Sequence, residues 1–454
     1  MAVYVIGGGF AGCEAAWQLA RQGINVKLLD MKPAERSPAH ISDSLCELVC
    51  SNSFKSKDVT SASGLLKEEM RLLGSLCISA ADQTAVPAGG ALAVDRERFS
   101  EKVTHALKTD PKIEIFTRRI DSLEEIAKEP DAQAVIIATG PLTGDALAED
   151  LKRRIGTESL AFYDAAAPLI YKDSIDFSKA FYASRYGKGD GEYINCPLTM
   201  QEYAAFYEAL VNADCAEVHG FEEGAVYQDC MPVESMARRG AETLRFGPMK
   251  PVGITNPATG EKYAAVVQLR RDNAEDTLYN IVGFQTRLKF PEQRRVFGMI
   301  PGLEHAEFAR YGVMHRNTYI KSPALLDETY MAVKHDLGVA LPVFFAGQLT
   351  GVEGYIESAS SGLIAGINAA QRIRGGEPVI FTRATQIGAL ASYAANYGGG
   401  DFQPMGANFG IMCYNPLAES GHRPDKKKKK EFISAKALET IEEIKRSRSD
   451  YFGR

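Results

Sequence analysis

Hydrophobic and polar positions at the start of the chain predict a strand, a helix and a second strand. Val3–Ile6 is a short apolar run typical of a buried strand, and glycines follow it at once. Apolar residues then recur at helical spacing, at Phe10, Cys13, Trp17 and Ala20. Gly23 predicts the end of that helix, and a second apolar run, Ile24–Leu29, ends at Asp30.

The glycines between the first strand and the helix have the spacing of a dinucleotide-binding loop. Gly7, Gly9 and Gly12 give G-x-G-x-x-G, which lets the backbone approach a pyrophosphate at a helix N-terminus. An acidic residue at the end of the next strand can accept a hydrogen bond from a ribose 2′-hydroxyl. The candidate cofactor-binding residues are therefore Gly7, Gly8, Gly9, Phe10, Ala11, Gly12 and Asp30. The alternative is a purely structural glycine turn.

Two later segments fit the same type of domain. Ala134–Thr139 and Val343–Ala346 are predicted as buried strands, each followed by a glycine, Gly140 and Gly347. A long amphipathic helix is predicted after Gly354 and ends at Gly375. Its N-terminus could face a flavin ring, because a helix dipole stabilises the negative charge of reduced flavin. The further candidate cofactor residues are Gly140, Gly347, Gly351 and Gly354; alternatively, these glycines only form turns.

The nucleotide signals lie far apart, so the domain that carries them must be discontinuous. We expect an α/β fold: a doubly wound, Rossmann-like FAD-binding domain of the glutathione-reductase type at 1–163 and 326–454. The residues between, 164–325, are expected to form an inserted α+β domain that binds the substrate or RNA. Short β-like runs there include Tyr263–Leu269 and Tyr279–Phe284.

Composition excludes several classes of protein. The 454 residues are 45% apolar and 24% charged, which is typical of a globular protein and not of a disordered, collagen-like or coiled-coil chain. The sequence lacks a run of 18 apolar residues, and its first apolar run is too short for a signal peptide. Eight scattered cysteines without a secretory signal predict free thiols in a cytoplasmic protein. Cys46 and Cys50 lack further ligands nearby, so no metal site is expected.

Charge is unevenly distributed. The net charge is −6, but residues 421–454 carry 11 Lys and Arg against 6 Asp and Glu. A basic tail on an acidic body could contact nucleic acid, whereas a lysine run such as Lys426–Lys430 is more commonly a solvated, mobile segment.

Beyond these patterns, the chain closely resembles, over nearly its full length, the bacterial folate- and FAD-dependent tRNA (uracil-5-)-methyltransferase family. The segments that carry the resemblance are Gly7–Gly12, Cys50–Ser53, Val86–Arg96, Ala138–Thr143, Arg185–Gly187, Phe246–Gly253, Arg310–Tyr319 and Gly347 with Gly351–Ser358. The last of these is also similar to a larger flavoprotein that modifies wobble uridines and has a C-terminal extension not found in this sequence.

The resemblance implies methylation of the T-loop uridine of tRNA at carbon 5. The methylene carbon would come from 5,10-methylenetetrahydrofolate, and the reducing equivalents from NAD(P)H by way of FAD. Close members of the family modify a uridine of 23S ribosomal RNA instead, so the choice between the two RNAs stays open. The implied partners are RNA and folate, and neither DNA nor a membrane is expected.

Carbon 5 of uracil is a weak nucleophile, so the reaction needs a thiolate that adds to carbon 6 and a base that later removes the carbon 5 proton. Cys230 is the candidate nucleophile, because the resemblance matches it to the family cysteine before Met231. Pro232 is predicted as the first residue of a helix that runs to Arg239, which would lower the pKa of a thiol at its N-terminus. Asp229 opposes this effect, and an inert buried cysteine is the alternative.

Cys50 is the candidate for proton transfer, because a tight turn at Ser51–Ser53 could present its thiol near the flavin. The resemblance supports a second catalytic cysteine here, and the roles of the two could be exchanged. Cys46 lacks a family match and is interpreted as structural. The resemblance also suggests that the imidazole of His315 stacks the folate pterin against the flavin; as a bare residue it would be a hydrogen-bonded histidine.

Two groups of basic residues could hold RNA phosphates or could be ordinary surface charge. They are Arg287, Lys289, Arg294 and Arg295, and Arg238, Arg239, Arg245 and Lys250. Two other functions are weighed against RNA methylation: an FAD-dependent thiol or disulfide oxidoreductase that uses Cys46 and Cys50, and a flavin-sensing RNA-binding protein without catalysis.

Overall fold

The computed structural model describes most of the chain. The described residues are 1–37, 39–156, 160–165, 167–187, 192–216, 231–312, 314–399, 402–413 and 426–448, with only the backbone of 160–165, 314–318 and 426. Within these ranges, none of the helices combines the length and apolar character that crossing a membrane requires.

The first sheet is fully parallel and carries the nucleotide signals. Its order is β16-β7-β1-β2-β6. The bounds are β1 (Ala2–Ile6), β2 (Val26–Asp30), β6 (Ile113–Thr117), β7 (Ala132–Ile137) and β16 (Val343–Phe345). From β1 the chain continues on one side to β2 and β6, and later returns on the other side as β7 and β16. This reversal defines a doubly wound sheet, as the sequence predicts.

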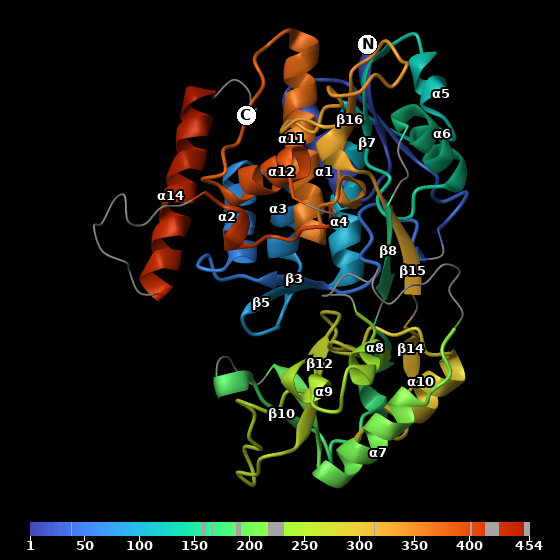
Figure 1. Ribbon diagram of the computed structural model, residues 1–454, viewed down its shortest axis with the longest axis vertical. Coiled ribbons are helices and arrows are strands. Elements are labelled where there is room, and N and C mark those ends of the chain that lie inside the picture. Colours follow the sequence, from blue (N-terminus) through green and yellow to red (C-terminus); the bar gives the residue numbers. More distant parts are fainter. Residues whose placement is uncertain are drawn as a thin grey trace.

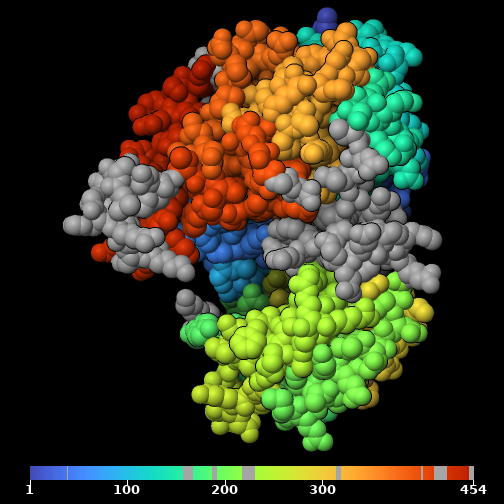
Figure 2. Space-filling model, in the orientation of Figure 1, coloured from blue at the N-terminus to red at the C-terminus, as the bar shows by residue number. Residues whose placement is uncertain are grey.

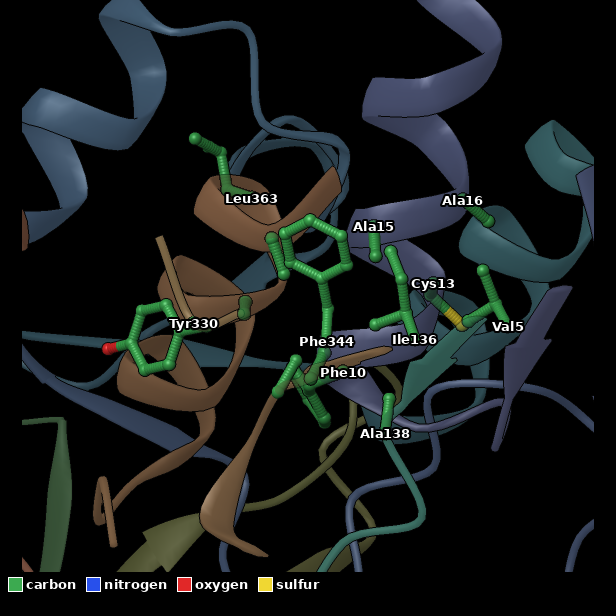
Figure 3. Packing of buried hydrophobic residues seen from close by; sticks show 14 of the residues in the cluster. Val5, Phe10, Cys13, Ala15, Ala16, Ile136, Ala138, Tyr330, Phe344 and Leu363 are labelled. Carbon is green, nitrogen blue, oxygen red and sulfur yellow. The ribbon is translucent and has the colours of Figure 1, made fainter. Parts of the chain in front are cut away.

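Two helices pack tightly against each other over this sheet. The α1 helix (Phe10–Arg21) starts directly after the glycine loop, and α11 (Tyr355–Arg374) ends at Gly375 as predicted. A Cβ atom at Gly362 or Gly366 would lie 2.1 Å from Ala11 O or 2.7 Å from Ala15 O, respectively, so only glycine permits this approach. Figure 3 shows the shared core, with side chains of the sheet strands packed against those of both helices.

Further helices complete this part of the molecule (Figure 1). They are α2 (Ala62–Leu72), α3 (Leu76–Gln83), α4 (Arg96–Thr109), α5 (Leu123–Ala127), α6 (Asp145–Ile155), α12 (Gln386–Asn396) and α14 (Lys426–Ser447). A small antiparallel sheet has the order β3-β5-β4, with β3 (Ser53–Ser56), β4 (Ala85–Val86) and β5 (Ala91–Val94). Short 3-10 turns occur at Lys172–Ser174, Arg185–Gly187, Ser322–Ala324, Gln348–Thr350 and Phe409–Ile411.

The lysine run near the C-terminus differs from the sequence expectation of a mobile segment. Lys426–Lys430 form the first turn of α14, which packs on α2. Ile433, Ala437 and Ile441 are buried at four-residue spacing, and the side chains of 427–429 are exposed. The apolar stripe that follows the lysines explains why the segment is helical.

The second part of the molecule is an α+β structure built around an antiparallel sheet of order β10-β11-β12-β13-β9-β14. The strands are β9 (Leu169–Tyr171), β10 (Phe181–Tyr182), β11 (Tyr193–Leu198), β12 (Ala265–Arg271), β13 (Leu278–Ile281) and β14 (Phe308–Arg310). The helices are α7 (Met200–Val211), α8 (Val233–Arg238), α9 (Thr243–Phe246) and α10 (Phe290–Phe297). The two β-like runs of the sequence correspond to β12 and β13, and a separate hydrophobic core lies here.

A two-stranded ribbon, β8 (Leu160–Ala165) paired antiparallel with β15 (Met314–Tyr319), joins the two parts. In Figure 1 the ribbon runs from the upper body toward the lower one, and Figure 2 shows the green and yellow body below the blue and orange one. The fold therefore contains a parallel-sheet core with an inserted α+β segment, and the borders 163/164 and 325/326 stay a prediction.

Candidate functional site

A pocket lies at the carboxyl ends of the parallel strands, where ligands bind in doubly wound sheets. Its volume is about 1180 Å³, including space open to solvent. Much of the lining comes from the ends of three strands and the loops after them: the end of β1 and its loop (6–11), the end of β2 (29–32), and the loop after β7 (138–144). Further lining residues are His40, Glu47, Val49, 118–120, Leu147, Gly347 and Gln348 after β16, and Tyr355 and Ser358 in the first turn of α11. The pocket thus brings together segments more than 300 residues apart in the chain.

The glycines of the first loop differ in their surroundings: Gly7 and Gly12 are required by close contacts within the protein, whereas Gly9 is not. Gly7 has a φ of +104°, and a Cβ atom there would lie 2.5 Å from Ala138 O. At Gly12 a Cβ atom would lie 1.8 Å from Gly7 O, so this glycine allows α1 to start against β1 and does not line the pocket. Gly9, by contrast, is exposed, and a Cβ atom there would have no neighbour within 4 Å.

The N-terminus of α1 has the properties of an anion site. Gly9 is its N-cap and no side chain caps it. The first N–H groups of the helix therefore keep their hydrogen-bonding capacity, and the helix dipole favours negative charge in front of them. Because Gly9 leaves open space there, a diphosphate fits this position.

Asp30 lies at the end of β2 and lines the same pocket. Its carboxylate accepts hydrogen bonds from Gly8 N at 2.6 Å and from Lys32 N at 2.8 Å, one on each oxygen. Each oxygen keeps a second lone pair for a ligand hydroxyl. Asp30 therefore holds the glycine loop in place as well as facing the pocket.

Further polar side chains line the pocket near Asp30, among them Lys32, His40 and Glu47. Lys32 Nζ lies 3.4 Å from a carboxylate oxygen of Glu47, and both side chains are nearly inaccessible to solvent. The His40 ring hydrogen-bonds to the Ser37 hydroxyl at 2.6 Å, and burial together with the Lys32 charge lowers the pKa of His40. This end of the pocket can therefore contact the polar groups of a nucleotide.

The four later candidate glycines differ in their positions. Gly347 has a φ of +81° and lines the pocket, with its N–H donated to the Ser361 hydroxyl at 2.7 Å. Gly351 (φ +77°) and Gly354 (φ +122°) do not line it; they permit the turns that place the start of α11 there. Gly140 also has a positive φ, +70°, and lines the pocket.

Cys50 is connected to the pocket through Tyr355. The Tyr355 ring stacks on Phe10 of the nucleotide loop, with ring centroids 4.7 Å apart. Its phenol oxygen lies 3.0 Å from Cys50 Sγ and accepts a hydrogen bond from Cys50 N at 2.8 Å. One tyrosine thus joins the candidate proton-transfer thiol to the loop that would hold a nucleotide.

Two predicted site residues cannot be placed with their side chains. Cys230 lies outside the described residues, and for His315 the structure gives only the backbone, in β15. The helix predicted after Cys230 is observed as α8, with Pro232 as its N-cap and not its first helical residue. Glu234 in its first turn accepts hydrogen bonds from the Thr286 hydroxyl and Arg287 N, and burial raises the pKa of Glu234.

Cys46 is structural, as the sequence analysis interprets it. It is fully buried, and its sulfur lies 3.9 Å from Cys77 Sγ. Burial raises the pKa of Cys46, which keeps the thiol protonated and unreactive. A buried and protonated thiol is a poor nucleophile, which argues against a redox role of Cys46.

Many members of the two basic groups are paired within the chain. Arg295 binds Glu292 at 2.6 Å, Arg245 binds Glu242 at 2.7 Å, and Lys289 lies 3.6 Å from Asp214. Arg294 donates to the Tyr311 hydroxyl. These contacts reduce the charge that remains for RNA phosphates.

Sequence reasoning missed Tyr355 and three arginines around Cys50: Arg96, Arg270 and Arg310. A partial signal existed, since Arg270 lies in the apolar run of β12 and Arg310 opens one of the family-like segments. A charged residue within an apolar strand indicates a buried partner or a functional site. Their convergence on one loop is not visible in the sequence.

Comparisons with known proteins find similar sequences over nearly the whole chain. Residues 2–377 match the family model of glucose inhibited division protein A. The protein named Methylenetetrahydrofolate--tRNA-(uracil-5-)-methyltransferase TrmFO from Acetivibrio thermocellus is 53% identical over 441 residues, which are 97% of this chain and 98% of that protein. The protein of the same name from Enterococcus faecalis is 52% identical over 442 residues, 97% of this chain and 98% of its own.

Among solved structures, a crystal structure of GidA from Aquifex aeolicus has a TM-score of 0.68 and 19% sequence identity. The match covers 99% of this chain and 75% of GidA. At this identity the likeness concerns the fold, and it agrees with a parallel-sheet core that carries an inserted segment.

Proposed function

The chain belongs to the family of methylenetetrahydrofolate–tRNA-(uracil-5-)-methyltransferases, and we propose that it methylates carbon 5 of the T-loop uridine of tRNA. As a member it is an FAD-dependent enzyme that takes its carbon from 5,10-methylenetetrahydrofolate and its reducing equivalents from NAD(P)H. The T-loop position is the finer part of the proposal. Ribosomal RNA is the alternative substrate.

The residues of the pocket fit FAD. The open space at Gly9 and the uncapped start of α1 suit the diphosphate, and Asp30 suits a ribose hydroxyl. Gly140, Gly347 and the first turn of α11 line the remaining length of the pocket. When bound there, FAD supplies the reducing equivalents for the transferred carbon.

Two cysteines of the chain perform the acid–base and nucleophilic chemistry in this proposal. The Cys230 thiolate adds to carbon 6 of uracil, which forms an S–C bond and makes carbon 5 nucleophilic. After carbon transfer, the Cys50 thiolate takes the proton from carbon 5. The electron pair of that C–H bond forms the double bond between carbon 5 and carbon 6. The S–C bond to Cys230 then breaks, and its electron pair stays on sulfur.

The observation that carries the assignment of Cys50 is its contact with Tyr355. Tyr355 lines the nucleotide pocket and lies 3.0 Å from the Cys50 sulfur, so this thiol is next to the position that a cofactor would take. His315 is proposed to stack the folate pterin, on the resemblance alone. A cytoplasmic location, and the absence of DNA and membrane partners, stay predictions that fit a tRNA substrate.

The proposal is tested with a T-loop RNA that carries 5-fluorouridine, from which no carbon 5 proton can be removed. With all cofactors present, the wild-type enzyme should accumulate a covalent RNA adduct on Cys230. Cys230→Ala should abolish the adduct, whereas Cys50→Ala should keep it and lose 5-methyluridine formation on ordinary RNA. The exposed Cys413→Ala serves as the control.

Full adduct yield with Cys230→Ala would reject this residue as the nucleophile, and loss of the adduct with Cys50→Ala alone would exchange the two roles. The RNA substrate is settled separately by nucleoside analysis of tRNA and ribosomal RNA from a deletion strain. Loss of 5-methyluridine from ribosomal RNA alone would refute the tRNA proposal.

A further inference from the structure

The loop that carries Cys50 is held by three arginines from three different elements. Arg96 of α4 donates to Leu48 O at 2.7 Å and to Cys50 O at 3.2 Å. Arg310 of β14 donates to the same Cys50 carbonyl at 3.4 Å. Arg270 of β12 donates to the Ser51 hydroxyl at 2.7 Å and to the Asn52 side-chain oxygen at 3.0 Å. We call these three residues the arginine cluster.

The arginine cluster carries an excess of positive charge. Arg96 pairs with Asp272 at 2.5 Å, and this aspartate is 1% exposed. Among the described residues, neither Arg270 nor Arg310 has a carboxylate within ion-pair distance. Within the described part of the chain, three guanidinium groups against one carboxylate leave two positive charges without an ion-pair partner.

Burial makes this excess of positive charge energetically unfavourable. Arg270 is 8% exposed, and Nε of Arg310 is buried without a hydrogen-bond partner. Burial lowers the pKa of both arginines, because loss of solvent disfavours the charged form. A neighbouring negative charge would therefore be stabilised by both of them.

Tyr355 of α11 contacts the sulfur directly, at 3.0 Å. Its phenol oxygen already accepts the Cys50 N–H, which leaves its own proton free to be donated to the sulfur. Burial and the Cys50 charge raise the pKa of Tyr355 well above its usual value, so the phenol stays protonated. A protonated phenol donates a strong hydrogen bond to a thiolate.

We propose that the arginine cluster and Tyr355 keep Cys50 in its thiolate form, with Arg270 and Arg310 as positioning residues that supply the uncompensated positive charge. The charged and titratable groups that contact Cys50 or its loop include Arg96, Arg270, Arg310 and Tyr355. The Asp272 carboxylate, which pairs with Arg96, opposes ionisation of the thiol.

This inference rests on the proposed function for its purpose, because a general base must be unprotonated before it can act. Ionisation releases the thiol proton to solvent and leaves the electron pair on sulfur. That pair then accepts the carbon 5 proton of the substrate. The ionised thiol itself, however, can be measured without any substrate.

The experiment measures iodoacetamide alkylation of Cys50 in the holoenzyme between pH 5 and 10, with the labelled peptide quantified by mass spectrometry. The midpoint reports the pKa of the thiol, and the exposed Cys413 of the same chain supplies the reference. In the wild type, the Cys50 midpoint should lie at least about one pH unit below that of Cys413.

Arg310→Gln and Arg270→Gln should each raise the Cys50 midpoint by about one unit, and Arg310→Lys, which keeps the charge, by less. The matched control is Arg98→Gln, an exposed arginine on the same helix as Arg96, and it should leave the midpoint unchanged. If a glutamine variant fails to fold, the wild-type comparison and Arg310→Lys still test the proposal.

A wild-type Cys50 midpoint equal to or above that of Cys413 would overturn the inference, as would an unchanged midpoint in folded Arg310→Gln and Arg270→Gln. These outcomes are separate from those of the proposed function. If Cys50→Ala still forms 5-methyluridine, the proton-transfer role is wrong while a low midpoint stands. If the midpoint is ordinary but Cys50→Ala is inactive, the inference alone is wrong.

Discussion

The phenol oxygen of Tyr355 lies 3.0 Å from the sulfur of Cys50, and the two residues are 305 positions apart in the chain. The same tyrosine ring stacks on Phe10, at the start of the helix that follows the glycine loop. The Tyr355 ring is therefore held by stacking on Phe10, and its phenol group positions the Cys50 thiol.

Tyr355→Phe should keep the ring stacking and remove the hydrogen bond to sulfur. We expect flavin content to be unchanged and the single-turnover rate of RNA methylation to fall about tenfold or more, because a hydrogen bond to a charged group contributes roughly 1.5–3 kcal/mol. An unchanged rate would show that the phenol does not assist Cys50.

Two glycines of the same loop should give opposite phenotypes. Gly12→Ala places a Cβ atom 1.8 Å from Gly7 O and should prevent folding or reduce stability by several kcal/mol. Gly9→Ala meets no atom of the protein and has a permitted φ of −80°, so stability should be preserved while FAD binding weakens. The ratio of flavin to protein absorbance and the melting temperature of the apoprotein separate the two effects. Normal flavin content in Gly9→Ala would contradict the diphosphate position.

Asp30→Asn should weaken both the loop and the cofactor site. Its carboxylate accepts from Gly8 N and Lys32 N, and an amide can accept only one of these hydrogen bonds. We expect a stability loss of about 1–3 kcal/mol and a higher FAD dissociation constant, measured by flavin fluorescence. Asp43→Asn, on an exposed carboxylate that pairs with Arg36, is the control. Equal FAD affinity in the two variants would exclude a role of Asp30 in binding.

The buried ammonium group of Lys67 should make the free energy of unfolding depend on pH. It is 2% exposed, donates to Phe54 O and Ser63 O at 2.7 Å each, and burial lowers its pKa from 10.5 to about 8. Between pH 8 and 10.5 the unfolded chain binds this proton more strongly than the folded chain. The contribution of Lys67 to the free energy of unfolding therefore rises with pH across this window, by up to about 3 kcal/mol.

Urea unfolding of the wild type and of Lys67→Met at pH 7.5 and pH 10 isolates this contribution, because the tyrosines and the other thiols titrate alike in both proteins. The stability of the wild type relative to the variant should increase at the higher pH. A constant difference would mean that the ammonium is not desolvated in the folded protein.

Local sequence patterns predicted four of the five strands of the parallel sheet and missed β6. The strands β1 and β2, the glycine loop and the end of α11 at Gly375 lie where periodicity and glycine placement predict them, because each is determined by residues close in sequence. The prediction that the lysine run is a mobile segment was wrong. The run begins a helix, α14, whose formation depends on an apolar stripe that packs against α2. The helix predicted from Pro232 to Arg239 is one residue shorter at each end, because Pro232 is its N-cap and Arg239 its C-cap.

The surroundings of Cys50 could not be predicted in the same way. Cys50 was predicted as a site residue through the family resemblance. No pattern in the sequence predicts that Arg96, Arg270 and Arg310 contact its loop. These residues come from a helix of the first part and two strands of the inserted segment, and their meeting depends on how the two parts pack.

The sequence by itself determined a dinucleotide-type fold, the glycines of its loop, and membership of a methyltransferase family through long matching segments. The tertiary structure decided which charged groups face the Cys50 loop and which tyrosine touches its sulfur. The physical reason is that hydrophobic period and glycine conformation act over a few neighbouring residues, whereas the electrostatic environment of a thiol is set by groups that only chain folding brings together.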